Sequence, residues 1–140
     1  MIEKLMLFPN FKNYRNNENL TLEELRDKSI YYEQNDNLQE AIRNAKIAAI
    51  NYGIEGIMLY LPLQYKHIHN LYSNNEVIQQ ESQKTLALII FTETEIGKKK
   101  YPRAMLNDLE ELKTSLLKIT QDKNFILSEA KQIASQMSLP

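Results

Sequence analysis

LRDKSIYYEQNDNLQEAIRNAKIAAINYG, residues 25–53, contains two helical patterns separated by a polar turn at 35–37. Thr21 and Glu24 precede the first pattern with the spacing of a capping box, in which each side chain accepts from the other residue's backbone N–H. Asn and Asp compete for backbone hydrogen bonds, so the first helix should end at the turn. Its apolar and small residues recur every three or four positions and predict one shared face: Leu22, Leu25, Ser29 and Tyr32.

A second helix is predicted over residues 38–52, with a face that is unusually rich in alanine. Alanine lets a neighbouring helix approach to the close end of the usual interaxial range, about 8 Å. Gly53 is well placed to adopt the left-handed conformation that ends a helix. These features predict a tight antiparallel hairpin whose second helix turns inward the residues Leu38, Ala41, Ile42, Ala45, Ala48, Ala49 and Tyr52.

The same hairpin resembles one tetratricopeptide repeat, which pairs a small residue and an aromatic on its first helix with an acidic-polar turn and an alanine-containing second helix. Three positions depart from the pattern of that family: Leu25 replaces tryptophan, Lys28 replaces leucine and Gly53 replaces the closing proline. The resemblance implies a helical repeat, although such repeats need roughly three copies for independent stability. The matching positions are Ser29, Tyr31, Tyr32, Asn35, Asp36, Asn37, Glu40, Ala41, Ile42 and Ala48.

The rest of the chain is also predicted to be helical, and no linker is long or biased enough to divide domains. We therefore expect an all-α bundle or short solenoid of helical hairpins, with five to six helices in a single domain over residues 1–140. Residues 1–19 are expected to form a partly mobile N-terminal segment, which is apolar up to Phe8 and polar over residues 10–19, with Phe11 and Tyr14 as anchors. Further helices are expected over 54–73, with a kink or a break at Pro62, and over 76–95 and 102–121. After a turn at 122–124, a last helix is expected whose inward-facing residues run from Phe125 to Met137.

Composition excludes several classes of protein. The formal charge is −1, so nothing indicates nucleic acid or an acidic membrane as an obligatory partner. The sequence contains no cysteine, which excludes disulfides and thiolate metal sites and fits a reducing compartment. The most apolar run, residues 86–91, is too short to span a bilayer, and no targeting segment is evident. We expect a soluble, cytoplasmic protein without a membrane partner.

No residue pattern indicates catalysis, a metal or a cofactor. His67 and His69 are the only histidines, and two positions apart on a helix they point about 200° apart, so they cannot share one metal ion. The carboxylate pairs of the sequence fall on faces expected to be exposed, and phosphate-loop and nucleophile-elbow motifs are absent. An enzyme is not expected, and an enzyme without a recognisable motif is our second alternative.

The leading hypothesis is a non-catalytic protein–protein interaction module that binds another protein or itself. An adaptor, a regulator and a toxin-neutralising partner fit equally well. Aromatic side chains dominate interface energetics, and tyrosines bury their rings while directing hydroxyls to water or a partner. The candidate partner-binding residues are Tyr31, Tyr60, Tyr65 and Tyr72.

The first alternative is a nucleic-acid-associated helical protein. Its candidate residues follow Gly97, where a helix is predicted to end. Cations at a helix C-terminus interact favourably with the helix dipole, and this structural interpretation outweighs nucleic-acid binding. The basic residues of the alternative are Lys98, Lys99, Lys100 and Arg103, with Lys12 and Arg15 as possible additions.

Overall fold

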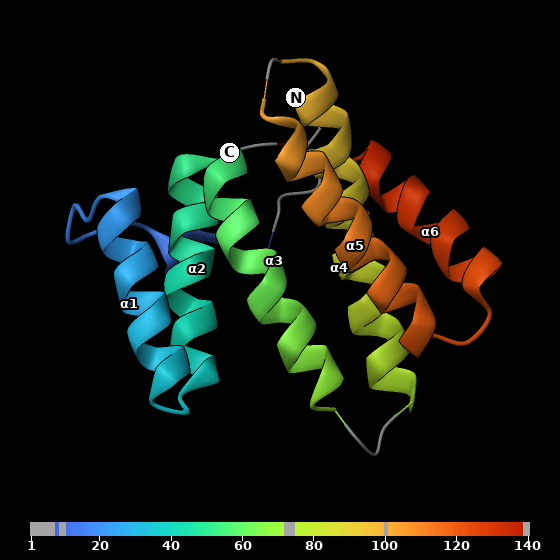
Figure 1. Cartoon of the computed structure of the whole chain (residues 1–140), viewed down its shortest axis with the longest axis horizontal. Helices are drawn as coiled ribbons and strands as arrows, with labels where there is room; N and C mark the ends of the chain where they lie inside the picture. The colour runs from blue at the N-terminus through green and yellow to red at the C-terminus, as the bar shows by residue number, and fades with distance from the viewer. Residues whose placement is uncertain (1–7, 9–10, 72–74, 100, 139–140) are drawn as a thin grey trace. The chain divides into compact units, whose positions relative to one another are not determined.

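The computed structural model describes residues 8, 11–71, 75–99 and 101–138 and confirms the all-α prediction (Figure 1). Within these residues the number of α-helices, six, agrees with the predicted five to six. The elements are the short 3-10 helix η1 (Phe11–Tyr14) and the α-helices α1 (Leu22–Gln34), α2 (Leu38–Tyr52), α3 (Ile54–His69), α4 (Asn75–Gly97), α5 (Arg103–Ile119) and α6 (Lys123–Ser135).

The chain forms two compact units, and the division between them falls inside α3, between Gln64 and Tyr65. The N-terminal unit comprises the described residues up to Gln64 together with Ser138, and the C-terminal unit comprises the described residues of 65–137. The single domain over residues 1–140 stays a prediction, because units of this kind are compatible with one domain or two.

The start of α1 has the predicted capping box. Thr21 Oγ1 accepts from the backbone N–H of Glu24 at 3.1 Å, and Glu24 Oε1 accepts from the backbone N–H of Thr21 at 3.0 Å. This backbone donor, followed by the Thr21 hydroxyl, holds the pKa of Glu24 below its ordinary value of 4.5. The predicted turn is also present, because Asp36 adopts a positive φ of 58° and Asn37 Oδ1 accepts from the backbone of Glu40 to cap α2.

Helix α2 begins and ends where the alanine-rich pattern predicts. Gly53 follows it with a φ of 68°, a positive value that glycine tolerates without strain. Leu38 is only half-buried and Tyr52 is 41% exposed, so the buried face is shorter than predicted. The predicted inner residues that are buried are Ala41, Ile42, Ala45, Ala48 and Ala49.

The small residues of α2 allow close contact with the first turn of α3. A Cβ atom built on Gly56 would overlap the backbone of Ala48 and Ala49. Helix α1 packs along α2 in the opposite direction (Figure 1). Leu25 of α1 packs with Ile47 and Ala48 of α2 in the core of this unit, and Tyr14, Leu20, Leu22 and Leu59 lie against them.

The prediction for Pro62 left two alternatives, a kink in one helix or a break near Leu61. Helix α3 continues through Pro62, which is exposed, so the alternative of a break is wrong. A proline ring prevents only one hydrogen bond and crowds one turn of a helix. The side chains of Leu61 and Leu63 are buried, and their packing holds the flanking turns in place.

The segment before α1 is fastened to α2. Asn51 donates through Nδ2 to the carbonyl of Tyr14 at 2.9 Å, and the Tyr52 hydroxyl donates to the carbonyl of Leu20 at 2.5 Å. The Lys46 ammonium lies 5.2 Å from the ring centre of Tyr14, within cation–π range. Tyr14 therefore anchors this segment as predicted, while most of residues 1–10 lie outside the described residues.

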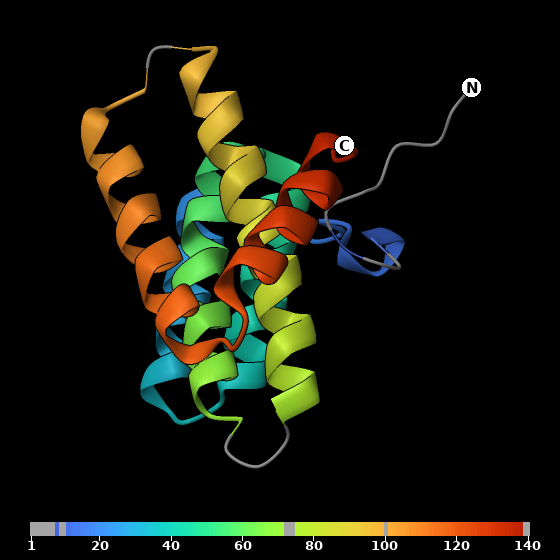
Figure 2. The same cartoon turned by 90° about the vertical axis from the view of Figure 1, so that its right-hand side faces the viewer.

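The C-terminal unit is built around α4. Helices α5 and α6 both pack against α4, and α4 and α5 run in opposite directions (Figures 1 and 2). Buried positions on α4 run from Ser82 to Ile96, so this helix enters the core along its length. Leu109 and Leu116 are buried on α5.

Helix α6 packs against α4 through one row of buried residues. Ile126, Ala130 and Ala134 recur every four residues and define its buried face. Phe125 is 56% exposed, because it lies one residue, or about 100°, away from that row.

Candidate protein-interaction surface

The four candidate tyrosines have different environments. Tyr31, in the last turn of α1, is 61% exposed. Tyr60 is 6% exposed, and its ring packs edge-on against Phe8 with 4.9 Å between ring centres. A binding partner contacts side chains that reach solvent. Tyr60 is therefore not part of the surface available to a partner. Tyr65 is half-buried beside His69, and Tyr72 lies outside the described residues.

Tyr31 has two apolar neighbours on α1. Ile30 is 42% exposed, and the ring of Tyr32 meets that of Tyr31 at 73° with 5.4 Å between their centres. Sequence reasoning missed Ile30, although helical spacing carried the signal. Ile30 directly follows Ser29, so it is rotated by about 100° from the buried row.

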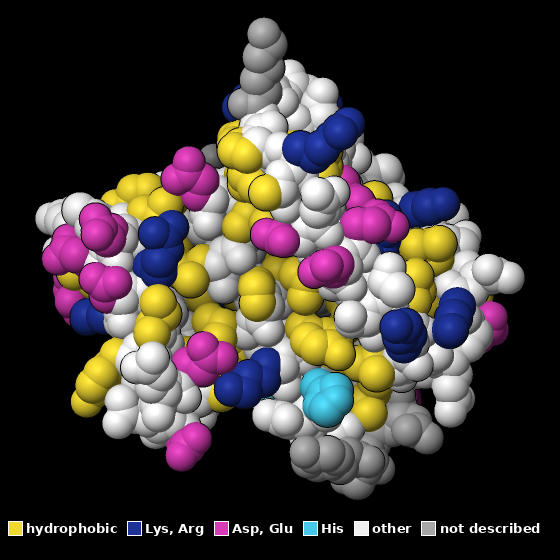
Figure 3. Space-filling view, viewed as in Figure 1, with side chains coloured by type: hydrophobic (Ala, Val, Ile, Leu, Met, Phe, Trp, Pro, Cys, Tyr) yellow, Lys and Arg dark blue, Asp and Glu magenta, His cyan; other side chains and the backbone are white. Residues whose placement is uncertain are grey.

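Ile30 and Tyr31 belong to a stripe of exposed side chains that faces away from Leu25 and Ser29. We name this stripe the α1 outer face. It is acidic in its first half and apolar near its end, and Asp and Glu side chains gather over the first half of α1 (Figure 3). The α1 outer face consists of Glu23, Asp27, Ile30, Tyr31 and Gln34.

The carboxylates in the acidic half of this face are not paired with basic residues of α1. Lys28 lies to one side of this face, with its ammonium 3.6 Å from the carboxylate of Glu18, which precedes α1. Glu23 and Asp27 have no ion-pair partner among the described residues. Their charges are therefore available to a binding partner.

The predicted basic residues follow α4, which ends at Gly97 as expected. Lys98, Lys99 and Arg103 are exposed, while Lys100 lies outside the described residues. The Lys98 ammonium is 3.3 Å from Glu95 Oε1, so part of this positive charge is offset within the unit. Nucleic-acid binding at this segment stays a prediction.

Two other groups of ionisable residues lie outside the α1 outer face. His67 and His69 lie in the last turn of α3, and the described residues contain no cluster of three or more His, Cys, Asp or Glu side chains placed to hold a metal ion. In the other group, the ammonium of Lys113 contacts the carboxylates of both Glu93 and Glu110.

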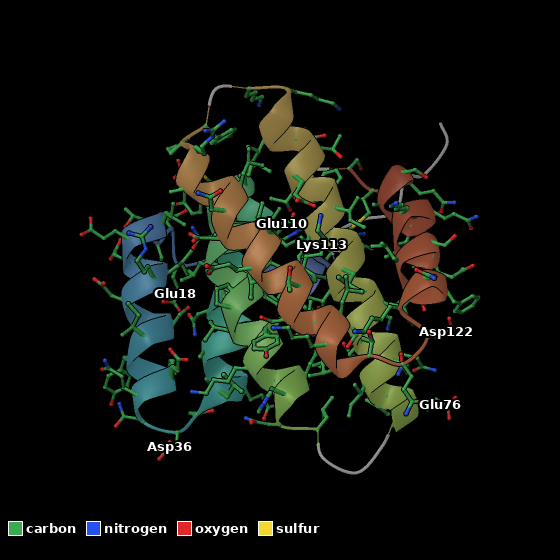
Figure 4. The ribbon with its side chains drawn as sticks, turned by 45° about the vertical axis from the view of Figure 1, so that its right-hand side comes forward. Glu18, Asp36, Glu76, Glu110, Lys113 and Asp122 are labelled. Carbon is green, nitrogen blue, oxygen red and sulfur yellow. The ribbon has the colours of Figure 1, made fainter. Side chains whose placement is uncertain are left out.

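Lys113 joins α5 to α4. Its ammonium lies 3.0 Å from Glu93 Oε1 and 3.1 Å from Glu110 Oε2 (Figure 4). Burial alone lowers the pKa of Lys113, but hydrogen bonds to the two carboxylates outweigh it and hold the pKa above the ordinary 10.5. These pairings satisfy the ammonium and favour a structural role in attaching α5 to α4.

The chain was compared with models of protein families, with curated proteins and with solved structures, and no match was found. No helix among the described residues combines the length and the apolar character needed to cross a bilayer. Arguments about function therefore rest on the geometry of this chain, and the α1 outer face is its best candidate surface.

Proposed function

We propose that this protein is a non-catalytic protein-interaction module that binds another protein through Ile30 and Tyr31. The observation that carries the proposal is the exposure of these two adjacent side chains, 42% and 61%, on helix α1. Single exposed apolar residues are ordinary on protein surfaces. An adjacent isoleucine and tyrosine supported by a second aromatic ring form a compact apolar anchor, and aromatic anchors supply much of the binding energy of interfaces.

The packing beneath this anchor supports the same function. Leu25 and Ser29 are buried against α2, so α1 presents Ile30 and Tyr31 from a fixed backbone. A preorganised surface loses less conformational entropy on binding than a mobile one. The tetratricopeptide-like character of residues 25–53 is a separate proposal, and binding by Ile30 and Tyr31 does not depend on it.

The absence of cysteine fits a reducing compartment, and we propose that the protein acts in the cytoplasm. An adaptor, a regulator and a toxin-neutralising partner would each use the surface in the same way. Identification of the bound protein would distinguish among these three roles.

The test is affinity capture from source lysate with nuclease treatment, followed by mass spectrometry. The variant Ile30→Ala/Tyr31→Ala removes the anchor and keeps helix-favouring residues. Phe125→Ala is the matched control, because Phe125 is an aromatic residue of similar exposure, 56%, on α6. Circular dichroism of each variant would verify that it is folded.

We expect wild type and Phe125→Ala to capture one partner protein in near-stoichiometric amount. The amount of this protein captured by the double variant should be at least about tenfold lower. Equal recovery by all three proteins would contradict the proposal. Recovery of nucleic acid alone, with nothing left after nuclease, would contradict it and favour the basic residues that follow α4.

A further inference from the structure

The α1 outer face combines charge and apolar surface in a way that specifies a partner. We propose that it binds a basic amphipathic helix of another protein, whose lysine or arginine side chains pair with Glu23 and Asp27 and whose apolar side chains cover Ile30 and Tyr31. This inference rests on the proposed function and names the chemistry of the partner.

The first argument is the alignment of the residues. Glu23, Asp27 and Ile30 follow one another at spacings of four and three, so they form one row along the helix. The face extends from Glu23 to Gln34, which corresponds to about 16 Å of helix. A partner helix of about three turns would cover it.

The second argument is charge complementarity. Glu23 and Asp27 are exposed and lack ion-pair partners among the described residues, whereas Lys28 is already beside Glu18. Arg26 lies at the edge of the face, next to the buried row. A basic partner would therefore meet carboxylates along the centre of the face, and complementary charges increase both specificity and association rate.

The same charges disfavour other occupants. The phosphates of nucleic acids and the headgroups of anionic lipids would be repelled by Glu23 and Asp27. A fully apolar helix would cover Ile30 and Tyr31 but would leave both carboxylates against an apolar surface, which is costly. A basic amphipathic helix satisfies both halves of the face.

The probe is a synthetic peptide of about 18 residues, an amphipathic helix of leucine and lysine, and its control is the same peptide with glutamate at every lysine. Backbone amide resonances of the full-length isotope-labelled protein would be followed during titration, at about 50 and 300 mM salt. Glu23→Gln/Asp27→Asn removes the two charges from the face. Its matched control is Asp108→Asn/Glu111→Gln, which removes two exposed charges from α5.

We expect the lysine peptide to shift resonances of residues 23–34. Its affinity should fall about tenfold in Glu23→Gln/Asp27→Asn and at the higher salt concentration, because exposed ion pairs are screened. The control variant should bind like wild type, and the glutamate peptide should not bind.

Three outcomes would overturn the inference: shifts centred outside α1, equal affinity in Glu23→Gln/Asp27→Asn and its control, or concentration-dependent α1 shifts without peptide, which would identify a second copy as the occupant. These outcomes are distinguishable from failure of the proposed function. If lysate capture depends on Ile30 and Tyr31 but not on Glu23 and Asp27, the function stands and the basic partner is wrong.

Discussion

In the N-terminal unit the buried face of α2 is mostly alanine, whereas the buried face of α4 in the C-terminal unit carries mostly larger side chains. The alanines are Ala41, Ala45, Ala48 and Ala49, and the larger apolar residues of α4 are Leu86, Leu88, Ile89, Phe91 and Ile96. The first unit is held together by close approach of helix backbones, and the second by side chains that fill the space between helices.

This difference determines how each unit responds to mutation. Where backbones approach closely, an added carbon atom has no space, and the helices must move apart. Where large side chains fill the core, the removal of atoms leaves a cavity. The N-terminal unit should therefore be the more sensitive of the two to added volume.

Gly56→Ala should have the largest effect. Its Cβ would overlap the backbone of Ala48 and Ala49, which cannot rotate away as a side chain can. We expect a loss of about 3 kcal/mol or more in the free energy of unfolding, at the upper end of overpacking costs. Urea denaturation followed by circular dichroism measures this loss.

Gly97→Ala is the matched control, because it makes the same chemical change at the end of α4. No atom lies within 4 Å of a Cβ built on Gly97. Alanine in that position should leave stability unchanged or raise it by up to about 1 kcal/mol. A similar loss in both variants would show that the close approach of α3 to α2 does not explain the sensitivity of Gly56.

Sequence patterns located the helices of the N-terminal unit but not the contact at Gly56. The bounds of α2 followed from the cap at Asn37, the alanine row and Gly53, all of which are local signals. The approach of Gly56 to Ala48 joins two helices through a change of chain direction, and residue spacing within one helix does not report that direction. The alanines predicted close packing of α2 with the first helix of the hairpin, and they did not predict the additional approach of α3.

The candidate surface was also predicted only in part, because residue spacing within one helix does not report contacts with other segments. Tyr31 and Tyr60 are both tyrosines on helices, and composition could not distinguish the exposed ring from the one that packs against Phe8. Helical spacing was sufficient to place Ile30 outside the buried row. It could not show that Lys28 lies beside Glu18, because Glu18 precedes the helix.

Ala45→Leu tests the alanine-rich buried face of α2 itself. Ala45 is fully buried on α2, and leucine there adds three carbon atoms between helices. We expect a loss of about 1–3 kcal/mol, smaller than that of Gly56→Ala because a side chain can partly reorient. An unchanged melting temperature would mean that the N-terminal unit is packed less closely than the structure indicates.

Lys113→Met tests the polar attachment of α5 in the C-terminal unit. Lys113 is partly solvent-exposed, so its pairing with Glu93 and Glu110 should contribute only about 1 kcal/mol or less. Because folding raises the pKa of Lys113 above 10.5, this contribution is complete below that pH and disappears as pH rises through the folded-state pKa. The stability difference between wild type and Lys113→Met should therefore shrink above pH 10.5.

Unfolding measured from pH 7 to pH 11.5 would follow this difference in stability. The upper limit lies about one pH unit above the ordinary pKa of lysine. Lys118→Met is the control, since Lys118 is an exposed lysine on the same helix. A difference that stays constant across the range would show that Lys113 stabilises α5 through the packing of its carbon chain.

The smallest expected effect on stability concerns Ser29 and Ser82. Each unit contains one of these two buried serines. Both hydroxyl oxygens are buried and have no hydrogen-bond partner among the described residues. An unpaired buried hydroxyl is unfavourable, so Ser29→Ala and Ser82→Ala should each be neutral or stabilise the protein by up to about 1 kcal/mol. Thermal denaturation of the two variants measures this effect in each unit.

Thr92→Val separates this effect from a general preference for apolar residues in the core. Thr92 is also fully buried, but its hydroxyl donates to the carbonyl of Leu88 at 2.7 Å. Valine keeps the shape and loses that bond, which should cost about 0.5–1 kcal/mol. If Ser29→Ala and Ser82→Ala are as destabilising as Thr92→Val, the serine hydroxyls have partners in solution, such as buried water, and small size is not the reason for serine in these helices.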